Sequence, residues 1–191
     1  VKAVETGEDS LQSVVSKHLN VQIGLDLGAD RWPGAEFWER TRTYGSLSRF
    51  RVDCEVVTCG IDGGGLDDLL ALTFTGRLKG GKGFYSWSHA WAHPSVLERR
   101  KEIEPRLRDF EAAGDLTIVE KAGDDVAELA AMVAQMQATG LLHAIGIDPA
   151  RIASIVSALT EVGIQTDNPE VLVKIRQGWS LYSAMLWMER L

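Results

Sequence analysis

The spacing of apolar residues divides the chain into a lead-in segment and a folded domain. Residues 1–20 carry apolar side chains at helical spacing, and a passage containing Gly and Asp follows them. Trp32-Pro33-Gly34 then interrupts the chain ahead of a short aromatic stretch. We therefore interpret residues 1–52 as a lead-in or linker segment that packs on a domain formed by residues 53–191.

Three strand candidates open this domain. Glu55–Ile61 is apolar and β-branched, and it stops at Asp62-Gly63-Gly64-Gly65. The strand pattern resumes at Leu69–Leu78 and again, after a turn rich in Gly and Lys, at Phe84–Trp91. Strands joined by short glycine-rich connections are typical of an antiparallel meander.

Helices and strands alternate in the rest of the domain. Pro94 opens a charged helix that reaches about Glu111, and we expect Pro105 to bend or divide it. Further strands are expected at Leu116–Val119, Leu141–Ile147 and Val171–Ile175, and further helices from Asp124-Asp125, over Pro149–Val162 and over Trp179–Leu191. Three antiparallel strands followed by this alternation predict an α/β fold with a mixed sheet flanked by helices.

The composition permits a DNA enzyme but argues against a protein that wraps nucleic acid. The 191 residues are 45% hydrophobic, which is enough to bury a core. Lys and Arg number 20 against 27 Asp and Glu, and the net charge of −7 argues against a broad basic surface. An active site made of metal-binding carboxylates is compatible with this charge. Neither a signal peptide nor a membrane-spanning stretch is present, so we expect a cytoplasmic protein with Cys54 and Cys59 as buried thiols.

Two aspartates end expected strands, and each has a structural alternative to a functional role. Asp62 precedes three glycines, which allow a sharp turn and the close approach of a ligand. It either caps that turn or binds a hard divalent cation. Asp148 either caps the helix that starts at Pro149 or contributes to the same metal site. If the two strands are neighbours, both carboxylates meet at one edge of the sheet and suit two-metal phosphodiester cleavage.

Several motifs follow one another in the order found in a known protein family. They are Leu66-Asp67-Asp68-Leu69 after the glycine-rich turn, Trp87-Ser88-His89-Ala90-Trp91, Leu97-Glu98-Arg99-Arg100, Ile147-Asp148-Pro149 and Gln177-Gly178. Their succession resembles the nuclease domain of phage terminase large subunits. The lead-in, with His18-Leu19-Asn20, Trp32 and Trp38, resembles the segment that joins the packaging ATPase to that domain. The resemblance covers nearly the whole chain.

The resemblance implies an RNase H-like fold and an endonuclease that cleaves double-stranded viral DNA during genome packaging. It implies Mg²⁺ or Mn²⁺ held by an acidic triad, in which Asp62 matches the first position and Asp148 the second. Asp68 matches a frequent acid of the glycine-rich turn that assists in metal binding, and Asp67 is the weaker match. The third acid of the family lies on a later helix, so we expect it beyond residue 191 and expect the isolated fragment to be weakly active or inactive. Glu189 is the late acid on the last helix, and we expect it at a solvated helix position rather than as a substitute for the third acid.

The resemblance also implies partners and a location. The implied partners are double-stranded DNA and, for the full-length protein, the phage portal and the terminase small subunit. The implied location is the cytoplasm of the host cell, and we expect the fragment to be monomeric. The P-loop of the packaging ATPase is absent from the sequence. Lys79, Lys82, Arg99 and Arg100 are candidates for contacts with DNA phosphates, with a solvated helix face as the alternative for the two arginines.

Two other functional classes remain open. The turn Asp62-Gly63-Gly64-Gly65 also resembles the phosphate-gripping turn of actin-like and sugar-kinase phosphotransferases, which need a duplicated domain for which this chain lacks room. A catalytically silent packaging-assembly module is compatible with the acidic charge. His89 and His93 are expected as packed or solvated histidines rather than as a metal pair, because Pro94 interrupts any helix that would align them.

Overall fold

The computed structural model of the chain describes residues 41, 45–65, 68–81, 83–149, 152–175 and 178–188. Gly45–Ser183 forms one compact unit, and the other described residues, Thr41 and Ala184–Met188, belong to a second unit. The helical stretch expected at residues 1–20 lies outside the described residues, as do Asp67, Lys82 and Glu189. Within the described ranges, no helix has the length and apolar character needed to cross a membrane.

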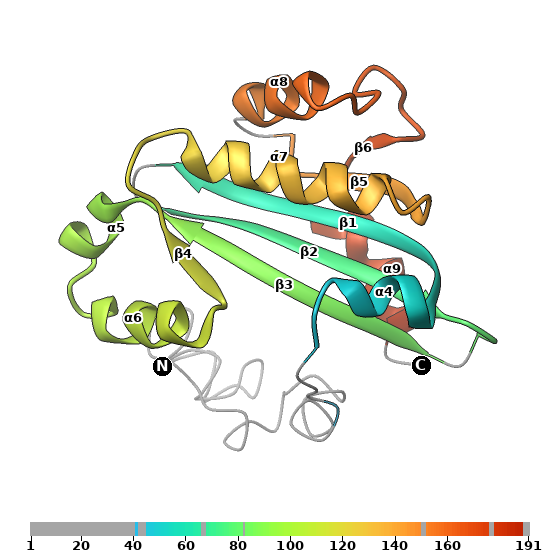
Figure 1. Ribbon diagram of the computed structural model, residues 1–191, viewed down its shortest axis with the longest axis horizontal. Helices are drawn as coiled ribbons and strands as arrows, with labels where there is room; N and C mark the ends of the chain where they lie inside the picture. The colour runs from blue at the N-terminus through green and yellow to red at the C-terminus, as the bar shows by residue number, and fades with distance from the viewer. Residues whose placement is uncertain are drawn as a thin grey trace, which may run out of the picture. The chain divides into compact units, whose positions relative to one another are not determined.

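The described strands form one mixed sheet of six. They are β1 (Cys54–Gly65), β2 (Asp68–Leu78), β3 (Phe84–Ala92), β4 (Leu116–Ile118), β5 (Leu142–Ile147) and β6 (Leu172–Lys174). Their order across the sheet is β4-β3-β2-β1-β5-β6 (Figure 1). β1, β2 and β3 are antiparallel neighbours, whereas β5 is parallel to β1, β6 to β5 and β4 to β3. This arrangement confirms the predicted α/β fold, in which three antiparallel strands are followed by parallel strands.

Helices connect the strands and pack on both faces of the sheet. The described helices are α4 (Ser48–Asp53), α5 (Pro94–Arg99), α6 (Glu104–Ala113), α7 (Asp124–Gln137), α8 (Ala153–Glu161) and α9 (Tyr182–Met188), the last preceded by the 3₁₀ turn Gly178–Leu181. Pro105 lies in the first turn of α6, so the long helix expected from Pro94 is divided in two. α7 and α8 cover one face, and α5 and α6 pack on the other face beside β3 and β4. α7 packs against β2 and α8, and Figure 1 shows it running alongside the sheet with α8 next to it.

Several boundaries differ from the sequence prediction, among them the start of the last helix, which is Tyr182 after a 3₁₀ turn instead of Trp179. β1 continues through the glycines to Gly65 instead of stopping at Asp62, because the glycine backbone stays paired with β2. α7 has Gly123 as its N-cap residue, so the expected aspartate cap is wrong by one position. α8 begins at Ala153 rather than at Pro149, and Ile155 and Leu159 are its buried residues. A proline favours a helix start, but burial of the apolar face decides where the helix forms.

The two faces of the sheet differ sharply in composition. Side chains alternate between the faces of a strand, and on β1 the odd-numbered residues from Val57 to Ile61 are buried. They form one core with α7 and α8, to which Leu129, Val133 and Leu159 contribute. The central part of the opposite face carries small or polar residues, namely Thr58, Gly60 and Asp62 on β1, Ala71, Thr73 and Thr75 on β2, Ser86 and Ser88 on β3, and Ala144 and Gly146 on β5. Beside β4 the same face is apolar, and Leu69, Ala90 and Ala92 pack there with α5 and α6 in a second hydrophobic cluster.

The short helix α4 belongs to the core of the sheet unit. Phe50 is 0% exposed and lies against Phe74 and Tyr85, with ring centroids 6.1 and 4.7 Å away. Gly76 makes room for it, because a Cβ there would lie 2.9 Å from the Phe50 ring. Part of the expected lead-in segment, residues 1–52, is therefore integral to the unit that contains the sheet.

Both cysteines are free and buried, as the sequence predicts. Burial raises the pKa of the Cys59 thiol to about 12, which disfavours the reactive thiolate.

Candidate functional site

Asp62 and Asp148 lie side by side at one edge of the sheet. β1 and β5 are parallel neighbours, and Ile61 pairs with Ile147 in their register. Both isoleucines are buried on the face that α7 and α8 cover, so the residues that follow them point to the opposite face. Neighbouring strands are about 4.8 Å apart. The structure therefore brings the two aspartates together on the face opposite to α7 and α8.

Their carboxylates border an open hollow in this face. It has a volume of about 290 Å³ and is lined by Gly60, Ile61, Asp62, Ala71, Thr73, Gly146, Ile147, Asp148 and Ile175. Gly60 and Gly146 are register partners, and neither fills the space above the strands with a side chain. A Cβ on Gly146 would lie 3.1 Å from Cγ1 of Ile175. The glycine pair thus forms the floor of the hollow.

The structural alternatives for the two aspartates do not match the structure. Asp62 lies within β1, paired with Ala71, and does not cap a turn. Asp148 is not the N-cap of α8, because Ile152 occupies that position and no side chain caps the helix. The backbone conformation explains the glycines after Asp62. Gly63 and Gly64 have φ values of 74° and 108°, which residues other than glycine rarely adopt.

The third candidate acid lies apart from this pair. Asp68 pairs with Gly65 at the start of β2, and its Oδ1 accepts a hydrogen bond from the backbone N–H of Leu69 (2.9 Å). It lies three residues along β2 from Ala71, a displacement of about 10 Å, and does not line the hollow. Within the described part of the chain, no group of three or more His, Cys, Asp or Glu side chains could hold a metal ion.

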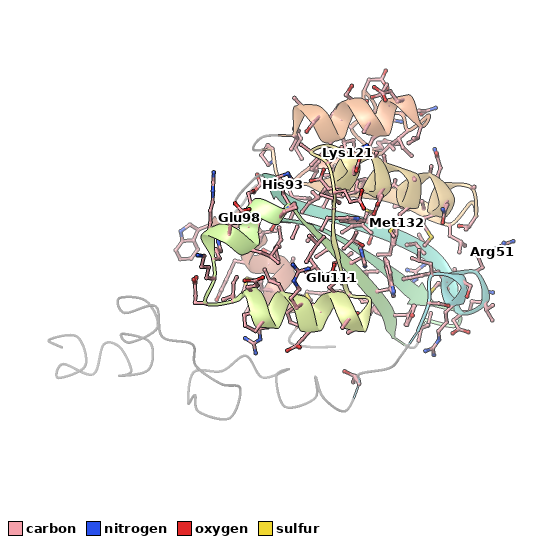
Figure 2. All side chains as sticks on the ribbon, turned by 60° about the vertical axis from the view of Figure 1, so that its left-hand side comes forward. Arg51, His93, Glu98, Glu111, Lys121 and Met132 are labelled. Atoms are coloured by element: carbon pink, nitrogen blue, oxygen red, sulfur yellow. The ribbon has the colours of Figure 1, made fainter. Side chains whose placement is uncertain are left out.

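The candidate DNA-contacting residues lie at opposite ends of the sheet. Lys79 donates a hydrogen bond to the carbonyl of Val52 at the end of α4 (2.7 Å), and it lies about 27 Å along β2 from Ala71, the partner of Asp62. Arg99 and Arg100 end α5, which follows β3 at the same end as Asp62. Figure 2 shows this separation, with Glu98 of α5 and its N-cap residue His93 at one end and Arg51 of α4 at the other.

The two histidines are packed side chains. His89 is 8% exposed and lies parallel to the Trp87 ring. Its Nε2 is 2.9 Å from Oγ1 of Thr117, and burial lowers its pKa. His93 caps α5, accepting a hydrogen bond from the backbone N–H of Ser95.

Sequence reasoning missed the floor of the hollow and its polar wall, Thr73. A signal for the floor is present, because the tripeptide Gly-Ile-Asp occurs at Gly60–Asp62 and again at Gly146–Asp148. Each copy places a glycine two residues before an aspartate, on the same face of its strand.

Comparison with solved structures agrees with this architecture. The crystal structure of the large terminase of bacteriophage HK97 is similar over 71% of this chain and 28% of that chain, with a TM-score of 0.55 and 22% sequence identity. The chain has the fold of part of a phage large terminase. The predicted resemblance to terminase large subunits is thus confirmed at the level of the fold, although the chain spans only about 28% of that protein's length. No protein-family model matches the chain, and no curated protein sequence matches it.

Proposed function

We propose that this domain is a divalent-metal-dependent endonuclease that cleaves double-stranded DNA during viral genome packaging. The observation that carries the proposal is the placement of Asp62 and Asp148 next to each other on the neighbouring strands β1 and β5, on the face opposite to α7 and α8. The fold of a phage large terminase supports the same proposal.

The side chains around the hollow fit Mg²⁺ or Mn²⁺. Carboxylate oxygens are the ligands that these hard cations prefer, and the open hollow leaves space for water and a phosphate group beside Asp62 and Asp148. When bound, such cations stabilise the charge that develops on the phosphate and promote the ionisation of water. The two aspartates supply fixed negative charge that holds the cations at the strand ends. A further acid, from outside the described residues, completes the triad that the terminase resemblance implies.

The strand ends also suit an extended polyanionic substrate. Arg99 and Arg100 follow β3 at the end of the sheet where the aspartates lie, and both are exposed. We assign them to phosphate contacts that orient the duplex without reading its sequence. For the full-length protein, the portal and the terminase small subunit are the proposed partners.

The test compares cleavage of supercoiled plasmid with and without Mn²⁺ or Mg²⁺, using the full-length protein, which contains the third acid that the terminase resemblance implies. We expect Asp62→Asn and Asp148→Asn each to slow nicking at least about 100-fold, and EDTA to abolish it. Asp109→Asn, an exposed acid on α6, is the matched control and retains the wild-type rate. Circular dichroism checks that each variant is folded.

Calorimetric titration with Mn²⁺ gives a readout that does not depend on turnover. The Asp62→Asn and Asp148→Asn variants are expected to lose Mn²⁺ affinity, while Asp109→Asn retains it. Cleavage that is equally fast in the double variant Asp62→Asn/Asp148→Asn would contradict the proposal. Mn²⁺ binding without any cleavage would instead favour the silent assembly module.

A further inference from the structure

Thr73 shares the hollow with the two aspartates, and its Oγ1 is 2.9 Å from Oγ of Ser88 on β3. We propose that Thr73 is a substrate-binding residue, whose hydroxyl pair with Ser88 donates a hydrogen bond to a phosphate oxygen of the nucleic acid bound beside Asp62 and Asp148. The inference deepens the proposed nuclease function and rests on it for the identity of the ligand.

The register places Thr73 one row behind the aspartates. Gly60 pairs with Thr73 on one side and with Gly146 on the other, whereas Asp62 pairs with Ala71. Thr73 is therefore the diagonal cross-strand neighbour of Asp62, at roughly 7–8 Å. Because Gly60 and Gly146 carry no side chains, the Thr73 side chain borders open space.

A count of protons shows that the hydroxyl pair has a donor to spare. Thr73 and Ser88 each carry one hydroxyl proton, and their mutual hydrogen bond uses only one of the two. A phosphate group needs donors, whereas an ionised carboxylate only accepts hydrogen bonds. Among the described side chains that line the hollow, only those of Thr73, Asp62 and Asp148 carry polar atoms. The two carboxyl groups could donate a hydrogen bond only if they were protonated, whereas the Thr73 hydroxyl can donate one as it is.

A second hydroxyl pair on the same face provides a matched control. Oγ1 of Thr75 is 3.1 Å from Oγ of Ser86, and Thr75 is half-buried like Thr73. Its partner on β1 is Thr58 instead of a glycine, and it does not line the hollow. Thr75→Val therefore removes the same kind of hydroxyl from the same kind of pair, one step farther from the aspartates.

The experiment measures binding of a short fluorescein-labelled DNA duplex by anisotropy in the presence of Ca²⁺, and steady-state cleavage in the presence of Mn²⁺. Thr73→Val is expected to raise Kd and KM about tenfold, because it removes a hydrogen bond to a charged group, with kcat changing less than about threefold. Thr75→Val is expected to match the wild type, and Thr73→Ser, which keeps the hydroxyl, to restore most of the affinity. Equal Kd values for Thr73→Val and Thr75→Val, or no recovery in Thr73→Ser, would overturn the proposal.

The same data separate this inference from the nuclease assignment. If cleavage depends on Asp62 and Asp148 but Thr73→Val behaves like Thr75→Val, the phosphate contact is wrong and the nuclease assignment stands. If the wild type binds the duplex but does not cleave it, and Thr73→Val still weakens binding, the contact stands and the nuclease assignment is wrong. Thermal unfolding of the two valine variants provides the check on folding, since each loses one hydroxyl pair.

Discussion

The indole Nε1 of Trp91 donates a hydrogen bond to Oε2 of Glu128, with 2.8 Å between the two atoms. Trp91 lies almost fully buried on β3, and Glu128 lies on α7. The bond therefore ties the sheet to the helix that covers it. Glu128→Ala leaves the indole N–H without its acceptor, and we expect a loss of about 1–3 kcal/mol in the free energy of unfolding. Urea denaturation measures this loss. Glu128→Gln keeps an acceptor oxygen and should lose less; equal stability of the alanine variant and the wild type would show that water replaces the carboxylate.

His89 makes stability depend on pH. Burial lowers its pKa in the folded protein, against smaller opposing effects of Glu128 and Asp115. Below the ordinary histidine pKa of about 6.5, the unfolded chain takes up a proton that the folded protein still refuses. The contribution of His89 to the free energy of unfolding therefore decreases as pH falls from about 6.5 toward its lower pKa in the folded protein.

Thermal unfolding between neutral and mildly acidic pH tests this expectation. His89→Gln should flatten the part of the pH dependence that lies just below neutrality, whereas His143→Gln, at an exposed position, should leave it unchanged. The same slope in wild type and His89→Gln would assign the pH dependence to other groups.

The floor of the hollow should not tolerate a side chain without adjustment of Ile175. A Cβ on Gly146 would lie 3.1 Å from Cγ1 of Ile175, so Gly146→Ala is expected to cost about 1–3 kcal/mol through overpacking. Ile175→Ala, which removes Cγ1, should cost up to about 2–5 kcal/mol on its own. If the two side chains collide as the geometry indicates, the double variant loses less free energy of unfolding than the two single variants lose together. A double-mutant cycle from denaturation curves measures that coupling, and strict additivity would contradict it.

Lys79 and the pair Arg99 and Arg100 should respond differently to substitution. Lys79 donates to the last carbonyls of α4, so Lys79→Met is expected to reduce the free energy of unfolding by about 0.3–1 kcal/mol and to leave DNA affinity nearly unchanged. Arg99→Gln with Arg100→Gln should instead weaken DNA binding and lessen its salt dependence. Anisotropy titrations at several salt concentrations compare them. If Lys79→Met lost more DNA affinity than the double arginine variant, the bound DNA would instead lie at the Lys79 end of the sheet.

Phe50 should be as important for stability as any residue of the central strands. Its ring is fully buried between α4 and the sheet, and Phe50→Ala is expected to cost about 3–5 kcal/mol. Val52→Ala, at a position on the same helix that is 69% exposed, is the control and should have little effect. A small effect of Phe50→Ala would show that α4 is dispensable.

The strands were predictable because their signal is local. Alternating burial on β2 and β3, and the apolar run of β5, are each readable within a few residues of sequence. α4 was missed because its burial depends on Gly76, far away in the sequence, which leaves room for the Phe50 ring. The expected helix start at Pro149 was wrong for a related reason: the proline is a local preference, and tertiary packing decided otherwise.

The candidate site was predictable in its acids but not in its surroundings. Asp62 and Asp148 each end a recognisable apolar run. That β1 and β5 are neighbours, however, follows from the order of the strands in the sheet, which the two runs do not reveal. The diagonal position of Thr73 depends on the register of β1 with β2, which a run of residues does not encode by itself.

Asp62 and Gly63 are adjacent in the chain, but different constraints fix them. A Cβ on Gly63 would collide with the backbone carbonyl of Leu69, so this glycine is required by the hairpin whether or not the domain has an activity. Asp62, in contrast, lies within β1, paired with Ala71 of β2, and among the described residues it is not the cap of any helix. A descendant that lost the proposed nuclease activity would therefore be free to exchange the aspartate while inheriting the glycine. In such lineages a glycine at position 63 would indicate common descent, whereas the residue at position 62 would indicate whether the proposed activity has been retained.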